Sequence, residues 1–378
     1  MGKSARAFAF VLAATVTFGA ASSQAGYVMK VDDDSWISLG MGLRAHLGAQ
    51  QTAASEGWEK SLAFENGRIY INGGIVKGLT FEFNTEAANE TPGGSATEVV
   101  MLDAIAKFEF SEAFNIWAGR MLPPSDRANL SGPYYLNTWN GPWEGAAGPQ
   151  RYTNIYAGRD DGAAIWGQFQ GGKFKYQAGV FQGTGNSDSP NFAGRLTLNL
   201  LDPEPGYYNS STYYGTKNIF AIGVVYQIQA GGADNTVTNE VDRNFSGWNV
   251  DILYEYNLGE SVGTVTLDGA VYGYSNDGGT GIDTSNGLVT SDGLGYFALG
   301  GFMLPGKVGV GPFKGNPQAT IRYEQYRDDR TSGTGTTDRI DAALNWILDG
   351  HNAYLTLNYG KVLDTDQQEI ILGMQFQY

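Results

Sequence analysis

The most constraining feature of this chain is a series of segments, each about ten residues long, in which apolar and polar residues alternate. In the first segment, Ile37 and Leu39 alternate with Ser38 and Gly40. A period of two over this length predicts a β-strand with one apolar and one polar face. After residue 26 there is no run of 18 or more apolar residues, so the sequence excludes a transmembrane helix there.

About sixteen such segments follow one another along the chain. They lie near residues 36–49, 62–73, 79–87, 99–110, 114–122, 162–170, 173–183, 192–201, 218–229, 246–257, 263–275, 294–304, 317–327, 338–348, 352–360 and 368–378. An even number returns both chain ends to the same side of a closed barrel. We therefore predict an all-β fold, a transmembrane antiparallel β-barrel of about 16 strands, which is wide enough to enclose an aqueous channel. The segments near 219–228 and 294–304 are apolar on both faces, so the pattern leaves their register open.

A soluble β-sandwich would also alternate, but two features favour the barrel. The apolar faces end in aromatic residues, as an interfacial girdle requires. These residues are Tyr254, Tyr256, Trp346, Tyr359, Phe376 and Tyr378. Tight turns also alternate with long polar connections, which is the asymmetry of a transmembrane barrel. Two connections, 202–217 and 305–316, fall on the short side and yet are long.

The start of the chain is typical of an exported protein. Two basic residues precede an apolar stretch over residues 8–18, and residues 23–25 fit a small-x-small cleavage site. The apolar stretch is shorter than the ~20 residues that a membrane anchor needs. We expect a signal peptide over residues 1–25 and one outer-membrane barrel domain over residues 26–378.

Composition excludes several kinds of function. The chain has 39 acidic and 24 basic residues, a net charge of -15, which disfavours nucleic acid as a partner. It has no Cys and only two His, so thiolate or multi-histidine metal centres are not expected. We therefore expect no cofactor and no metal site. We expect no enzyme activity either, because a membrane hydrolase needs a serine–histidine pair at the rim, whereas His46 lies inside the first segment and His351 in a short-side turn.

Residues 121–161 form the longest irregular stretch and carry many aromatic side chains, which is not the composition of a disordered segment. We expect this constriction loop to fold into the barrel and narrow the pore. The alternative is a loop that folds over the outside rim.

Several stretches also carry a family resemblance. Residues 118–124 (AGRMLPP), 162–167 with 175–183, and 66–73 are similar to motifs of the phosphate-selective (O/P-type) porin family of Gram-negative bacteria. The resemblance implies a sixteen-stranded porin with an inward-folded third loop. It also implies a homotrimer in contact with outer-membrane lipid and lipopolysaccharide. Residues 122–133 further resemble a subgroup associated with selenite and other oxyanions.

Charge placement gives the candidate site. Inward positions of the predicted strands carry both signs, unlike the lysine- and arginine-rich walls of phosphate-selective members. Selectivity depends on charges at the narrowest point, where arginine forks suit oxyanions. The candidates are Arg44, Arg68, Arg120, Arg127, Arg151, Arg159 and Arg195, opposed by Asp126, Glu144, Asp160 and Asp161. Each could instead be a salt-bridge partner that holds the loop against the wall. Arg120 also shares the strand parity of the outward-facing Ile116 and Ala118.

The sequence therefore predicts a porin for passive diffusion of small hydrophilic solutes, anionic or neutral, with a preference for oxyanions such as phosphate or selenite. The alternative is a barrel that sheathes an electron-transfer conduit, which would bind a haem protein.

Overall fold

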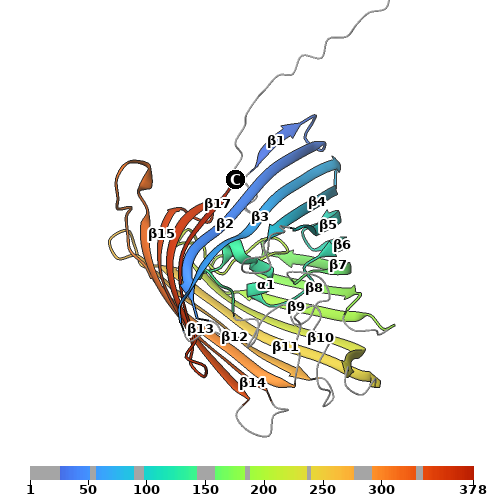
Figure 1. The fold of residues 1–378 in the computed structure, drawn as a ribbon. Coiled ribbons are helices and arrows are strands. Elements are labelled where there is room, and N and C mark those ends of the chain that lie inside the picture. The colour runs from blue at the N-terminus through green and yellow to red at the C-terminus, as the bar shows by residue number, and fades with distance from the viewer. Residues whose placement is uncertain are drawn as a thin grey trace, which may run out of the picture.

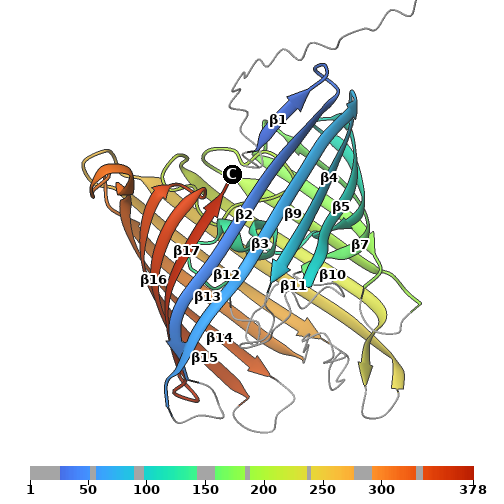
Figure 2. The ribbon, with the colours of Figure 1, turned by 45° about the horizontal axis from the view of Figure 1, so that its top comes forward.

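The structure is a computed structural model that describes residues 26–51, 57–88, 98–142, 158–183, 188–235, 240–275, 292–328 and 335–378. The expected signal peptide lies outside the described residues. Within them the chain forms a closed antiparallel barrel of sixteen strands (Figures 1 and 2). The ring closes where the last strand pairs with the first barrel strand, for example Leu372 opposite Leu47. This closure confirms the barrel over the sandwich.

The barrel strands follow the chain order and match the sixteen predicted segments, with shifted ends. They are β2 (Trp36–Gln50), β3 (Glu59–Val76), β4 (Leu79–Ala88), β5 (Glu98–Ser111), β6 (Phe114–Met121), β7 (Asp160–Phe169), β8 (Phe174–Phe181), β9 (Asn191–Asn199), β10 (Ile219–Asn235), β11 (Glu240–Asn257), β12 (Thr264–Ser275), β13 (Gly293–Met303), β14 (Asn316–Asp328), β15 (Thr336–Asp349), β16 (Ala353–Val362) and β17 (Gln368–Gln377). A further short strand that the pattern did not predict, β1 (Tyr27–Lys30), pairs with β2.

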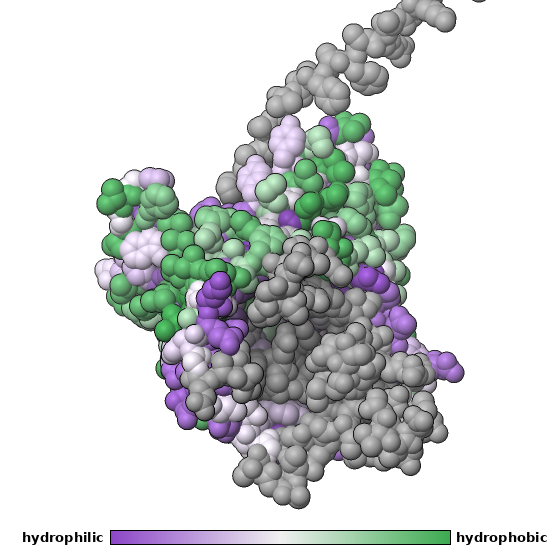
Figure 3. All heavy atoms as spheres, viewed as in Figure 1, coloured by the Kyte–Doolittle hydropathy of each residue, from purple (hydrophilic) through white to green (hydrophobic). Residues whose placement is uncertain are grey.

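The predicted alternation is present in the wall. On β2, Met41 is 63% exposed on the outer surface, whereas Arg44 is 3% exposed inside the barrel. Figure 3 shows hydrophobic residues gathered over the outer surface near β2 and β17, with hydrophilic residues towards the opposite end. An apolar surface of this extent is stable only against another apolar medium, and lipid provides it. Among the described residues, no helix is long and apolar enough to cross a membrane.

The two strands with apolar residues on both faces have a definite register. β10 places Val225 and Gln227 inside and Val224 outside. β13 places Phe297 inside, where it packs in a cluster with Phe245, Ala270, Tyr272, Tyr274 and Tyr326. The inner face of β13 is apolar because it packs in this aromatic cluster, whereas Ile219 and Ala221 of β10 pack with Leu253.

Two connections enter the lumen from opposite ends of the barrel. We call the end with the tight turns, where β2 begins and β17 ends, the short-turn side, and the other end the long-loop side. From the long-loop side comes the outer loop, residues 122–142, which holds the helix α1 (Arg127–Ser131) and the 3-10 turn η1 (Pro133–Tyr135) inside the barrel (Figure 1). The inward fold of the third loop is thus confirmed for these residues, and residues 143–157 lie outside the described part of the chain.

From the short-turn side comes the inner loop, residues 203–217. The other long connection on that side does not enter the barrel. Between β13 and β14, residues 304–315 form a hook at the rim (Figure 1), with the 3-10 turn η5 (Gly311–Phe313), and Val310 is 84% exposed.

Candidate functional site

The outer loop leaves the wall where the sequence ends a strand. β6 stops at Met121, and Pro123 and Pro124 follow, which cannot continue a strand ladder. Asp126 then stands at the N-cap position of α1, and Gly132, with φ of 62°, ends the helix. A positive φ is accessible to Gly without strain, so the chain can turn here towards the lumen centre.

The first half of the outer loop is held by the wall formed by β9 and β10. Gln227 Nε2 donates to the Pro124 carbonyl at 2.9 Å, and Arg195 Nη1 donates to the Ser125 carbonyl at 3.0 Å. The residues from Met121 to Ser131 are all buried. The wall therefore satisfies the backbone of a segment that has no strand neighbours.

The second half of the outer loop is held by the opposite wall. Arg44 of β2 donates to the Trp139 carbonyl at 2.5 Å, and its guanidinium lies 4.1 Å from the Trp139 ring centroid. Arg322 of β14 donates to the Asn140 carbonyl at 2.8 Å. Because β2 and β17 lie across the ring from β9 and β10, the outer loop spans the lumen from wall to wall.

The inner loop enters after the β9–β10 ladder has ended. Backbone hydrogen bonds join Leu200 to Phe220 and Asp202 to Asn218, each at 2.8 Å. Beyond them the chain folds into the lumen, where Thr212 is fully buried. The inner loop therefore starts and ends at two neighbouring points of the wall, since Asp202 and Asn218 already lie side by side.

The two loops meet through a buried ion pair. Arg127 of the outer loop makes a bidentate contact with Glu204 of the inner loop at 2.7 and 2.8 Å, and it also donates to the Ser210 carbonyl at 2.7 Å. Tyr207 donates its hydroxyl to the Leu122 carbonyl at 3.0 Å. Burial alone would raise the pKa of Glu204, but the Arg127 guanidinium lowers it to about 2, so the pair is ionised at neutral pH.

The wall also holds the inner loop directly. The Tyr207 ring stacks on Trp117 with centroids 4.8 Å apart. Lys175 donates to the Gly206 carbonyl at 3.0 Å and to Asn209 Oδ1 at 2.6 Å. The inner loop is thus anchored on β6 and β8 as well as on the outer loop.

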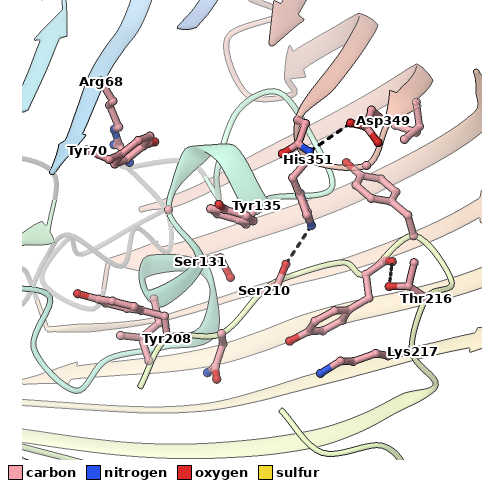
Figure 4. Close-up of a pocket in the computed structure, with 18 of the residues that line it drawn as sticks. Arg68, Tyr70, Ser131, Tyr135, Tyr208, Ser210, Thr216, Lys217, Asp349 and His351 are labelled. Atoms are coloured by element: carbon pink, nitrogen blue, oxygen red, sulfur yellow. Dashed lines mark hydrogen bonds between the residues drawn. The ribbon is translucent and has the colours of Figure 1, made fainter. Parts of the chain in front are cut away.

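His351, in the turn between β15 and β16, lies at the junction of both loops (Figure 4). Its Nδ1 is 3.2 Å from the Tyr134 carbonyl and its Nε2 is 2.9 Å from the Thr212 carbonyl. The rings of Tyr135 and Tyr214 lie 4.7 and 4.8 Å away. Burial lowers the pKa of His351 to about 4 although both carbonyls favour the charged form, so the imidazole is neutral at pH 7 and donates to one carbonyl only.

Most of the described candidate arginines lie inside the lumen, each beside a carboxylate. The pairs are Arg44 with Glu65 (3.8 Å), Arg68 with Glu86 (2.7 Å), Arg127 with Glu204 (2.7 Å), Arg159 with Asp103 (3.1 Å) and Arg195 with Asp251 (2.5 Å). Their guanidinium forks are therefore engaged in holding loops and wall together. Arg151 and Glu144, the other two loop candidates, fall outside the described residues.

Two of the predicted constriction residues face the other way. Arg120 on β6 and Asp161 on β7 lie directly opposite each other and form a bidentate pair at 2.9 and 3.0 Å. Both share the outward parity of Ile116, so they do not join the buried groups of the lumen. The neighbouring Asp160 does point inward, where its carboxylate accepts from the Gly183 N–H at 2.8 Å.

This placement predicts that Arg120→Gln leaves ion selectivity unchanged, because the lost charge faces away from the lumen. The reversal potential across a KCl gradient in a planar bilayer measures it. Arg195→Gln is the matched control on the lumen side, since it leaves the Asp251 carboxylate without its bidentate partner and should shift the potential towards cations. An equal shift in both variants would contradict the outward placement.

Asp126 is the buried carboxylate at the start of α1. Its Oδ2 accepts from the Tyr272 hydroxyl at 2.8 Å, and its Oδ1 has no hydrogen-bond partner among the described residues. Burial, together with the nearby Asp251 carboxylate, raises the pKa of Asp126 from 3.8 to about 7. The protonated form therefore favours the docked loop. This contribution is complete below the usual pKa of 3.8 and is lost as pH rises through about 7.

The expected result is that brief current fluctuations from loop loosening increase between pH 6 and pH 8 in single-channel recordings. Asp126→Asn, which mimics the protonated form, should give the same traces at both pH values. A wild-type record that does not change over this interval would show that Asp126 does not control the loop.

Sequence reasoning missed the inner loop and the groups that hold it, chiefly Glu204, Lys175 and His351. The signal was present, since the connection 202–217 is too long for its side of the barrel. It also contains the tyrosine pairs Tyr207-Tyr208 and Tyr213-Tyr214, which is the same aromatic content that marked the outer loop.

The sequence matches no family model and no curated protein. The fold is similar to an anion-selective porin from Comamonas acidovorans, with 15% identity, 91% of this chain and 100% of that chain covered, and a TM-score of 0.59. It is similar to Salmonella typhi OmpF in complex with daunomycin, with 12% identity, coverage of 92% and 98%, and a TM-score of 0.59. A mutant of the Rh. blastica porin gives 12% identity, coverage of 90% and 100%, and a TM-score of 0.51. At these identities the likeness establishes the architecture: this chain has the barrel fold that porins have.

Proposed function

We propose that the chain is an outer-membrane channel that passes small hydrophilic solutes and ions passively through its lumen. The observation that carries the proposal is a closed sixteen-stranded barrel, apolar outside and polar inside, whose lumen is crossed by a loop anchored on opposite walls. The porin neighbours support the same function. Such a constriction limits solutes by size while the barrel itself spans the membrane.

We further propose that selectivity among inorganic ions is weak. An oxyanion preference needs guanidinium groups that are free to receive the anion. The six described candidate arginines instead have carboxylates within 4 Å, which neutralise much of their field. Resemblance to the phosphate-selective family therefore supports the architecture more strongly than it supports phosphate as the substrate.

The assembly in the membrane is also a proposal. A Vibrio cholerae neighbour with the same fold is described in a trimer form, and a homotrimer in outer-membrane lipid and lipopolysaccharide is the arrangement we propose here. The signal peptide over residues 1–25 is the route of export in this proposal.

The proposal predicts that proteoliposomes take up neutral sugars at rates that fall steeply with size. Liposome swelling with a monosaccharide, a disaccharide and a trisaccharide measures this. Vesicles without protein and vesicles with heat-denatured protein are the controls. Swelling no faster than in the controls for the smallest sugar would contradict an open channel and would favour the sheath of an electron-transfer conduit.

One observation favours a second candidate function, hydrolysis at the lumen wall. Ser61 Oγ lies 2.8 Å from His46 Nε2, and His46 Nδ1 lies 2.5 Å from Glu65 Oε1, which is the order of a serine–histidine–carboxylate triad. His46 therefore has the serine partner that the sequence did not reveal. However, Glu65 also accepts from the Trp139 indole at 2.8 Å and faces Arg44, so the group as a whole holds the outer loop.

The two roles can be separated with a fluorophosphonate probe, which reacts with activated serines. The channel role predicts no labelling of the folded protein. Labelling that is lost in Ser61→Ala and in His46→Gln would establish the hydrolase instead.

A further inference from the structure

A cavity of about 560 Å³ lies in the lumen between the two loops and the short-turn side of the barrel. Figure 4 shows its middle, with the outer loop contributing Tyr135, the inner loop Tyr208 and Lys217, and the turn after β15 contributing His351. A volume of this size is typical of a site for a small organic molecule. A binding site here rests on the proposed function, because a solute reaches this cavity through the channel.

Two lysines of the lining, Lys217 of the inner loop and Lys307 of the hook, have no described carboxylate within ion-pair distance. Lys307 is exposed at the rim and donates to the Leu348 carbonyl at 2.6 Å, whereas Lys217 is half-buried among the tyrosines of the inner loop. Arg68 and Arg159 line the cavity as well, but Glu86 and Asp103 engage them. Lys217 donates to the Pro203 carbonyl at 3.0 Å, and no described carboxylate lies within ion-pair distance of it. An ammonium group with three donors, one of them satisfied by a neutral carbonyl, can still receive a carboxylate.

The rest of the lining is rich in aromatic rings. The Lys217 ammonium lies 5.2 Å from the centroid of the Tyr213 ring. Tyr208 and Tyr214 line the same cavity, and among the described residues their hydroxyls have no hydrogen-bond partner. Burial raises the pKa of both hydroxyls well above 10, so they are neutral donors at pH 7. Aromatic faces with a few placed donors favour a flat ring that carries a polar group.

The charge balance argues for a single negative charge on the ligand. Asp349 also lines the cavity. In the view of Figure 4, His351 lies between Asp349 and Lys217. His351 is neutral at pH 7, so it adds no positive charge. The Asp349 carboxylate repels a dianion such as phosphate more strongly than a monocarboxylate, which needs only the Lys217 ammonium.

We propose that this cavity is a transit binding site for small monocarboxylates that carry an aromatic ring, with Lys217 binding the carboxylate and the tyrosines of the inner loop contacting the ring.

The test measures block of the single-channel current by four probes: benzoate, acetate, benzyl alcohol and phosphate. Benzoate should block at a concentration at least five-fold lower than each of the other three. Lys217→Gln should raise the benzoate concentration for half block at least five-fold and leave that of benzyl alcohol unchanged. The matched control is Lys314→Gln, which removes an exposed lysine of the hook outside the lumen. It should behave as wild type.

Three results would overturn the site: no benzoate block in a conducting channel, equal block in Lys217→Gln, or phosphate block as strong as benzoate block. Equilibrium binding of benzoate to the detergent-solubilised protein, followed by ligand-observed NMR, separates this inference from the proposed function. A protein that conducts but does not bind benzoate would exclude the binding site and support the channel function. A protein that binds benzoate through Lys217 but does not conduct would support the binding site and exclude the channel function.

Discussion

Removal of the inner loop should raise single-channel conductance at least two-fold, the largest effect that the structure predicts. Residues 204–216 can be replaced by two glycines because Asp202 and Asn218 already lie side by side, joined by a backbone hydrogen bond of 2.8 Å. The β9–β10 ladder would then close in a short turn like those elsewhere on this side. The excised residues fill the lumen on the short-turn side of the outer loop, so their loss widens the conducting path.

The hook on the same side provides a matched deletion. Residues 309–314 can be excised between Val308 and Gly315, which are joined by two backbone hydrogen bonds of 2.9 Å. This segment is exposed at the rim and lies outside the lumen, so its removal should leave conductance unchanged. Equal conductance in wild type and the inner-loop deletion would mean that residues 204–216 do not obstruct the path.

The second large effect concerns the buried ion pair between the loops. Both side chains of the Arg127–Glu204 pair are 1% exposed. Removing one member leaves the other charge buried without its partner, which costs about 3–5 kcal/mol. We therefore expect Glu204→Leu and Arg127→Met each to lower the free energy of unfolding by this order, whereas the double variant should lose clearly less than the sum of the two.

Urea unfolding of the protein folded into lipid vesicles measures all four proteins of this cycle. Asp366→Asn is the control, because it breaks an exposed pair with Lys361 and should leave the free energy of unfolding unchanged. Additive losses in the double variant would contradict a coupled pair and would place the two residues in separate interactions.

The barrel could be predicted because each strand faces lipid on one side and the lumen on the other, and this produces an alternation of apolar and polar residues in the sequence. Most outward positions are apolar and most inward positions polar, as in β2, and this alternation repeats in most of the strands. The alternation does not predict the register of a strand where both faces are apolar. The inward Phe297 of β13 packs with aromatic residues of β12 and β14, and periodicity alone cannot distinguish that contact from contact with lipid.

The site was predictable by residue type and less so by arrangement. Which arginines of the strands lie inside follows from strand parity, and parity already set Arg120 apart. Which carboxylate each arginine contacts depends on contacts between distant segments. Glu204 meets Arg127 across 77 positions of the chain, and Asp251 meets Arg195 across 56. No local pattern encodes such pairs, so the sequence left open whether the guanidinium groups are free or paired, and the structure pairs them with carboxylates.

The inner loop illustrates the same limit. Its unusual length was visible, but the direction in which a loop folds is decided by what receives it. Here Lys175 and Glu255, one on each side of the entry point, accept or donate hydrogen bonds along the loop backbone. Both are inward strand positions, which the alternation predicts without assigning them a partner.

The central claim is that the barrel conducts through its lumen despite the two loops that meet inside it. The most direct measurement is single-channel recording of the purified, folded protein in a planar bilayer in KCl. The account predicts discrete, reproducible conductance steps for the wild type and larger steps for the inner-loop deletion. Absence of conductance above the bare bilayer in both proteins would contradict it.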